Sequence, residues 1–130
     1  MNPQYKPSGY NSVSPYLVVN GAQKMIALLK QIFHAGELRK YATSDGKIMH
    51  AEMKIDDSVV MLADASEEYP QNQFLIHVYV PDSSTIYRNA INAGCEPVEE
   101  PHQREGEPDR RGSFKDFAGN LWSVSTQVTK

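Results

Sequence analysis

The stretch VSPYLVVNGAQKMIALLKQIFHAGE, residues 13–37, decides the fold because its hydrophobic period changes in the middle. Residues 13–19 are rich in β-branched and aromatic side chains and end at Asn20-Gly21, which predicts a strand. From Ala22 onward the apolar residues recur at helical spacing until Ala35-Gly36 supplies a stop. Three further strand-like runs, separated by short turns, follow at residues 37–43, 47–55 and 59–63.

The same order of elements returns about 60 residues later. The run FLIHVYV, residues 74–80, predicts a strand, and Asp82 or Ser83 can then cap a helix through its side-chain oxygen. The apolar face of this helix ends at Ala93-Gly94. Further strands are expected at residues 96–99, 112–116 and 121–126.

The repeated order indicates a duplicated module rather than a coincidence between two amphipathic helices that both end at glycine. We therefore predict an α+β fold of two tandem βαβββ modules. Residues 1–12 are expected to form a flexible N-terminal extension, and residues 13–130 a single domain with modules at 13–66 and 73–128.

The composition is that of an ordinary globular protein. Hydrophobic residues make up 40% and charged residues 22% of the 130 residues, and the formal net charge of -3 gives no reason to expect nucleic acid or anionic lipid as a partner. No apolar run is long enough to span a membrane, and the N-terminus lacks the order of a signal peptide. The single cysteine fits a reducing compartment, so a cytoplasmic location is expected.

Three motifs resemble one known family. The run DRRGSFKDFAGNLW, residues 109–122, is similar to a "D-R…D-P-x-G-x-x-W" pattern, and HAEM, residues 50–53, and VMLAD, residues 60–64, look like the same group. The sequence thus resembles the vicinal oxygen chelate superfamily (glyoxalase, bleomycin resistance protein and dioxygenase), in its PhnB-like or bleomycin-resistance-like branch. Phe117-Ala118 departs from this pattern, since relatives often have Pro-Phe there. The resemblance implies a curved mixed sheet, a homodimer and a ligand cavity.

Metal-dependent relatives hold a divalent ion with side chains from the first and last strand of each module. Carried over to this sequence, those positions are Ser14, Met61, Leu75 and Ser123. A divalent ion of this kind prefers histidine, aspartate or glutamate donors, so thioether, alkyl and neutral hydroxyl groups are unsuitable. We therefore expect no metal site of the superfamily type and no cofactor.

Strand alternation predicts which side chains face the cavity. Together with the loop before residue 112, it nominates seven ligand-binding residues: Tyr16, His50, Glu52, His77, Tyr79, Arg110 and Ser123. His50 and Glu52 share one strand face and can form an acid–base pair or part of a metal site, but they can equally be satisfied polar groups. Glu52 can also form an ordinary charge pair with Lys54.

The run EEPHQREGEPDRR, residues 99–111, has no periodicity and contains two prolines and a glycine, which predicts a surface loop. Arg110 in such a loop can bind an anionic or carbonyl group of a ligand through its planar donors. The alternative is a solvated loop whose arginines offset their acidic neighbours.

The leading hypothesis is a metal-free protein that binds a small molecule, such as a drug or a metabolite, and sequesters it. The alternative is a divalent-metal-dependent glyoxalase-like lyase or a dioxygenase that uses His50, Glu52 and His77 as displaced ligands. A third hypothesis is a subunit-association module with a vestigial cavity. The fold alone cannot choose among these.

Overall fold

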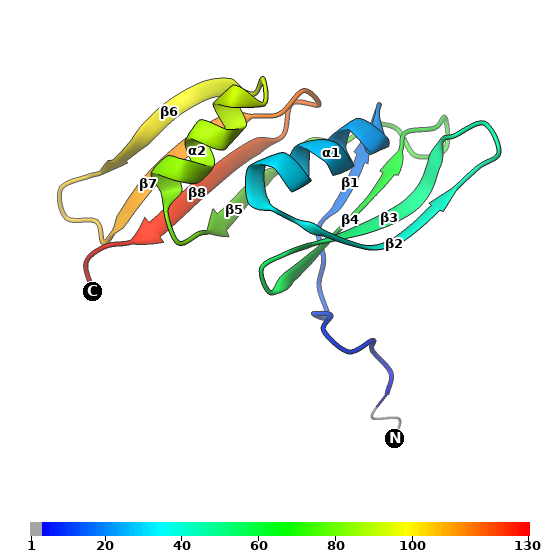
Figure 1. The fold of residues 1–130 in the computed structure, drawn as a ribbon, viewed down its shortest axis with the longest axis horizontal. Helices are drawn as coiled ribbons and strands as arrows, with labels where there is room; N and C mark the ends of the chain where they lie inside the picture. The colour runs from blue at the N-terminus through cyan, green and yellow to red at the C-terminus, as the bar shows by residue number, and fades with distance from the viewer. Residues whose placement is uncertain (1–3) are drawn as a thin grey trace. The chain divides into compact units, whose positions relative to one another are not determined.

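A computed structural model describes residues 4–130 and shows a βαβββ order that occurs twice along the chain (Figure 1). These residues divide into two compact units, one made of the chain up to Lys30 with His34–Asn72, the other of Gln31–Phe33 with Gln73–Lys130. In the described part of the chain, no helix is long and apolar enough to cross a membrane.

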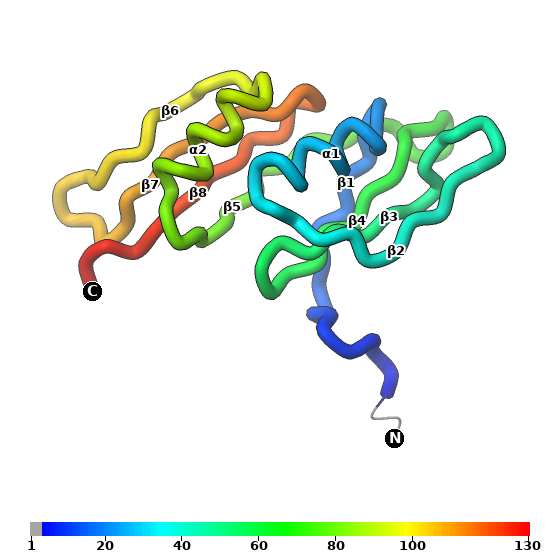
Figure 2. Tube along the Cα trace, viewed as in Figure 1, coloured from blue at the N-terminus to red at the C-terminus, as the bar shows by residue number. Residues whose placement is uncertain are grey.

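The two sheets have the same topology. The first-unit elements are β1 (Tyr16–Val19), α1 (Ala22–Phe33, whose last three residues group with the second unit), β2 (Gly36–Ala42), β3 (Ile48–Ile55) and β4 (Ser58–Asp64), with strand order β1-β4-β3-β2. The second-unit elements are β5 (Leu75–Tyr79), α2 (Ser83–Asn92), β6 (Glu96–Gln103), β7 (Asp109–Lys115) and β8 (Leu121–Gln127), with strand order β5-β8-β7-β6. In both sheets the first strand is parallel to the last and the other pairs are antiparallel. Figure 2 traces this path twice, and the predicted α+β fold of two tandem modules is confirmed.

The faces of the strands follow the predicted alternation. On β3, Ala51 and Met53 are fully buried, whereas His50 is only half-buried. On β5, His77 is exposed and Val78 half-buried, and on β8 Trp122 is buried to 1% exposure. Each sheet therefore has one core face, and its other face carries the polar residues of the predicted site.

The ends of the two helices differ from each other. Asp82 caps α2 as predicted, since its side chain accepts hydrogen bonds from the backbone N–H of Ser84 and Thr85. Helix α1, in contrast, does not end at Gly36. His34 takes the left-handed conformation, with φ 56, and its backbone N–H donates to the Lys30 carbonyl 3.0 Å away, so the helix closes two residues earlier than predicted.

The predicted loop at residues 99–111 is wrong, because β6 continues to Gln103 and β7 begins at Asp109. Edge strand β6 accommodates its prolines with two register shifts, between Pro97 and Glu99 and between Glu99 and His102. Gly112 makes the close pairing possible, since a Cβ atom there would lie 2.8 Å from the Pro101 ring. Arg110 consequently lies in a strand and not in a surface loop.

The DFAGNLW run, residues 116–122, has a structural role in the turn between β7 and β8. Asp116 is buried, and its carboxylate accepts hydrogen bonds from the backbone N–H of Ala118 and Asn120 and from Trp122 Nε1, at 2.9, 3.0 and 2.8 Å. Gly119 takes φ 88 at the tip of the turn, a conformation that glycine adopts without strain. Residues 116–122, the last part of one motif that carried the family resemblance, therefore build this turn.

Candidate functional site

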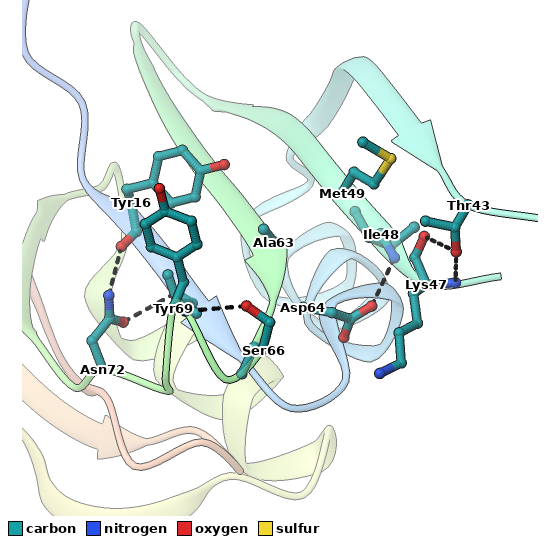
Figure 3. Close-up of a pocket in the computed structure, with 12 residues that line it drawn as sticks. Tyr16, Thr43, Lys47, Ile48, Met49, Ala63, Asp64, Ser66, Tyr69 and Asn72 are labelled. Carbon is teal, nitrogen blue, oxygen red and sulfur yellow. Dashed lines mark hydrogen bonds between the residues drawn. The ribbon is translucent and has the colours of Figure 1, made fainter. Parts of the chain in front are cut away.

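The first unit contains a cavity of about 720 Å³ beside β1 (Figure 3). This volume is in the range of sites for small organic ligands, and most of the lining is apolar. Figure 3 shows the rings of Tyr16 and Tyr69 at one end, and Thr43 and Lys47 at the other. The lining is formed by Tyr16, Val18, Thr43, Lys47, Ile48, Met49, Ala63, Asp64, Ala65, Ser66, Tyr69 and Asn72.

One wall of the cavity is the segment that follows β4, and Asn72 fastens it to β1. The Asn72 side chain accepts a hydrogen bond from the Val18 N–H at 3.0 Å and donates one to the Tyr16 carbonyl at 3.2 Å. Further back, the Ser66 N–H donates to the Tyr69 carbonyl and the Ser66 hydroxyl accepts from the Tyr69 N–H. This closed turn holds Tyr69 at the cavity although 64% of its surface is exposed.

Asp64 lies in the lining, but its carboxylate is engaged by the backbone. It accepts hydrogen bonds from the N–H groups of Gly21, Ala22 and Ile48 at 3.1, 2.8 and 2.7 Å. Burial alone would raise the pKa of Asp64, but these donors outweigh it and hold the pKa below its ordinary value. Asp64 therefore joins the start of α1 to β3 and stays ionised.

A chain of hydrogen bonds leads from the cavity into the sheet. The Tyr16 hydroxyl lies 2.8 Å from His50 Nδ1, and His50 Nε2 lies 2.8 Å from Glu52 Oε2. The structure thus brings together three predicted site residues and shows that His50 and Glu52 form a pair. Because the carboxylate accepts, the Nε2 atom of a neutral His50 carries the proton and Nδ1 is left to accept from Tyr16.

Glu52 is buried to 3% exposure because the N-terminal segment covers it. The Tyr10 hydroxyl donates to Glu52 Oε1, and Arg39 Nε lies 3.8 Å from the same oxygen while its guanidinium stacks over the Tyr10 ring. Burial alone would raise the pKa of Glu52, but the hydrogen bonds from Tyr10 and His50 and the charge of Arg39 hold it below its ordinary value. The basic residue that forms an ion pair with Glu52 is therefore Arg39, and not Lys54 as the sequence suggested.

In the second unit, three further predicted residues share the polar face of the sheet. His77 Nδ1 lies 3.0 Å from the Ser123 hydroxyl, and the His77 and Tyr79 rings meet edge to face at 5.1 Å. Tyr79 donates to Asp109 Oδ2 at 2.6 Å. Arg110 does not join them, since its Nε donates to the Ser84 hydroxyl of α2, on the helix side of the sheet. Ligand binding by these four residues remains a prediction.

The residues at the superfamily's metal positions do not fit a divalent ion. Ser14 precedes β1, the exposed Leu75 has no donor atom, and the strand register sets Met61 opposite Tyr16 and Ser123 opposite His77. Across residues 4–130, no three His, Cys, Asp or Glu side chains come together as a metal-binding group. Thioether and neutral hydroxyl groups are poor ligands for Zn²⁺ or Mn²⁺.

Sequence reasoning found Tyr16 in the lining and missed Tyr69, Asn72 and Met49. Tyr69 and Asn72 lie after β4, where neither the helical nor the strand period applies. Met49 lies at the start of β3 and is 63% exposed. In the sequence, the aromatic residue Tyr69 in a segment without strand or helix period was the available signal of this wall.

Comparison with solved structures identifies the fold. TioX from Micromonospora sp. ML1 is similar with a TM-score of 0.73 and 19% identity, over 90% of this chain and 98% of TioX. The fosfomycin resistance protein FosX from Listeria monocytogenes is similar with a TM-score of 0.71 and 17% identity, over 96% of both chains. The antibiotic-binding protein TnmS3 from Streptomyces sp. CB03234 is similar with a TM-score of 0.68 and 13% identity, over 97% of this chain and 99% of TnmS3. These likenesses show the fold, two tandem modules of the glyoxalase/bleomycin-resistance type, as the sequence resemblance implied.

A relative with closer sequence shows the family. No family model matches the chain. Uncharacterized protein Mb0911c of Mycobacterium bovis is 32% identical over 132 residues, which cover 90% of this chain and 84% of that protein. The chain therefore belongs to the same family as this mycobacterial protein.

Proposed function

We propose that the protein binds a small, largely apolar molecule in the cavity of its first unit, without a metal, and sequesters it. The observation that carries this proposal is the cavity itself, whose surface is mostly apolar and whose wall includes two tyrosine rings and Met49. Aromatic and methionine side chains bind flat apolar molecules well because they offer large, polarisable surfaces.

The structural neighbours support the kind of ligand. TnmS3 is described as an antibiotic-binding protein and FosX as a fosfomycin resistance protein, so the fold is associated with small drug molecules in both. A drug or a metabolite of similar size is the ligand class we propose here. The donor set at the superfamily's metal positions supports binding without a metal. We further propose that the protein is a homodimer, which light scattering of the purified protein would test.

Two lining variants test the site. A panel of aromatic antibiotics and metabolites is first screened for thermal stabilisation, and the affinity of the best compound is then measured by calorimetry. Tyr69→Ala removes one ring from the wall, and burying such a side chain against a ligand contributes about 1.5–3 kcal/mol, so we expect affinity to fall by roughly 10- to 100-fold. Met49→Lys places a charge in the apolar wall and should weaken binding at least as much.

Val98→Lys is the matched control, because Val98 is also an exposed apolar residue of a strand, at 51% exposure, and lies in β6 of the second unit. It should leave affinity unchanged. Equal affinity in Tyr69→Ala, Met49→Lys and the wild type would show that the ligand binds elsewhere. Elemental analysis of the same protein distinguishes this proposal from the metal-dependent alternative. One metal ion per chain, with ligand binding lost when the metal is removed, would indicate the metal-dependent enzyme.

A further inference from the structure

The hydrogen-bonded chain Tyr16–His50–Glu52 ends at the cavity, and Tyr16 is the member that lines it. We infer that this chain selects ligands with a weakly acidic hydroxyl group, a phenol or an enol, and binds them as anions while His50 takes up a proton. The inference rests on the proposed function, because it names the class of ligand for the same cavity.

The direction of the hydrogen bonds determines which ligand group fits. Glu52 can only accept, so neutral His50 donates from Nε2 and accepts at Nδ1, and Tyr16 donates to Nδ1. The Tyr16 proton is then used in the bond to His50, so the Tyr16 oxygen can only accept a hydrogen bond from a ligand. A ligand carbonyl or ether oxygen would meet another acceptor, whereas a hydroxyl group would complete the chain.

Proton movement along this chain is balanced. The ligand O–H proton passes to the Tyr16 oxygen as the Tyr16 proton passes to His50 Nδ1, which leaves a ligand anion and an imidazolium. No other bond is made or broken. The imidazolium forms 2.8 Å from the Glu52 carboxylate, which stabilises it as a charge-assisted pair.

The groups around the His50 ring are a carboxylate and an aromatic ring. Glu52 is the carboxylate that faces it, and the Tyr41 ring of β2 lies over the imidazole with centroids 6.4 Å apart. Arg39 and Tyr10 contact the far oxygen of Glu52 and keep the carboxylate ionised. Burial and the charge of Glu52 raise the pKa of Tyr16, so Tyr16 stays a neutral phenol that relays the proton without holding the negative charge.

The test uses two chromogenic probes of the same shape. para-Nitrophenol can ionise and absorbs differently as the phenolate, whereas para-nitroanisole carries a methyl group in place of the proton. We expect bound para-nitrophenol to show the phenolate band at a pH where the free probe is largely neutral, with its apparent pKa lowered by about one or more, as a nearby positive charge does.

Three variants remove the relay one member at a time. Tyr16→Phe removes the acceptor, His50→Gln removes the basic nitrogen and Glu52→Gln removes the counter-charge. Each should abolish most of the shift in the probe's pKa, while para-nitroanisole, which has no proton to give up, reports whether each variant still binds an aromatic ring. Tyr5→Phe, at an exposed tyrosine of the N-terminal segment, is the matched control and should change neither readout.

The outcomes separate this inference from the proposed function. Binding of para-nitroanisole with no phenolate band for para-nitrophenol overturns the relay but leaves the cavity as a binding site. A phenolate band that persists in His50→Gln also overturns the relay. Failure of both probes to bind overturns the proposed site for aromatic ligands and this inference with it.

Discussion

Replacing Asp116 with asparagine should destabilise the second unit strongly, although the two side chains have the same shape. Oδ1 of Asp116 accepts from the backbone N–H groups of Ala118 and Asn120, and an asparagine oxygen in that place can keep both bonds. Oδ2 accepts from Trp122 Nε1 at 2.8 Å and from Asn120 Nδ2 at 3.1 Å. An NH2 group there would face two donors.

The magnitude follows from these two conflicts. Each buried donor left without an acceptor costs about 1–3 kcal/mol, and local relaxation recovers part of that, so we expect a loss of about 2–4 kcal/mol in the free energy of unfolding. Urea denaturation monitored by the fluorescence of Trp122, the sole tryptophan, measures it. Asp82→Asn is the matched control, because asparagine caps a helix as well as aspartate does and should change stability by no more than about 0.5 kcal/mol. An Asp116→Asn effect as small as that of the control would refute the role given to this carboxylate.

Two further predictions concern single residues of the fold and the site. The pKa of Glu52 is lowered in the folded protein, so the ionised carboxylate stabilises the fold above its ordinary pKa of 4.5, and this stabilisation is lost as the pH falls through the folded pKa. The difference in urea midpoint between the wild type and Glu52→Gln should therefore narrow below about pH 4.5. A difference that does not change with pH would contradict the ionised, hydrogen-bonded state of Glu52. Gly112→Ala should cost about 1–3 kcal/mol because the new Cβ would lie 2.8 Å from Pro101. Gly36→Ala, where nothing lies within 4 Å of the added Cβ, should be near neutral, and equal effects of the two would show that the β6–β7 pairing adjusts freely.

The order of the elements, the duplication and the faces of the strands could all be predicted from local sequence patterns. These features follow from local periodicity, since a period of two along β3 or β5 sorts residues such as Ala51 and His50 onto opposite faces wherever the strand is placed. The cap at Asp82 was also predictable, because it involves only the residues that follow it. The unsuitability of Met61 and Leu75 as metal ligands is a property of the residues alone.

The contacts that complete the site could not be predicted, because they join residues far apart in the chain. Tyr10 meets Glu52 across 42 residues, and Asn72 fastens Tyr69's segment to β1 across 54, contacts that no local period encodes. The pairing of β6 with β7 likewise overrode the loop-like composition of residues 99–111, because register shifts and a close approach at Gly112 accommodated the prolines. Burial of a charged group such as Glu52 depends on which distant segments cover it, and only the folded chain brings those segments together.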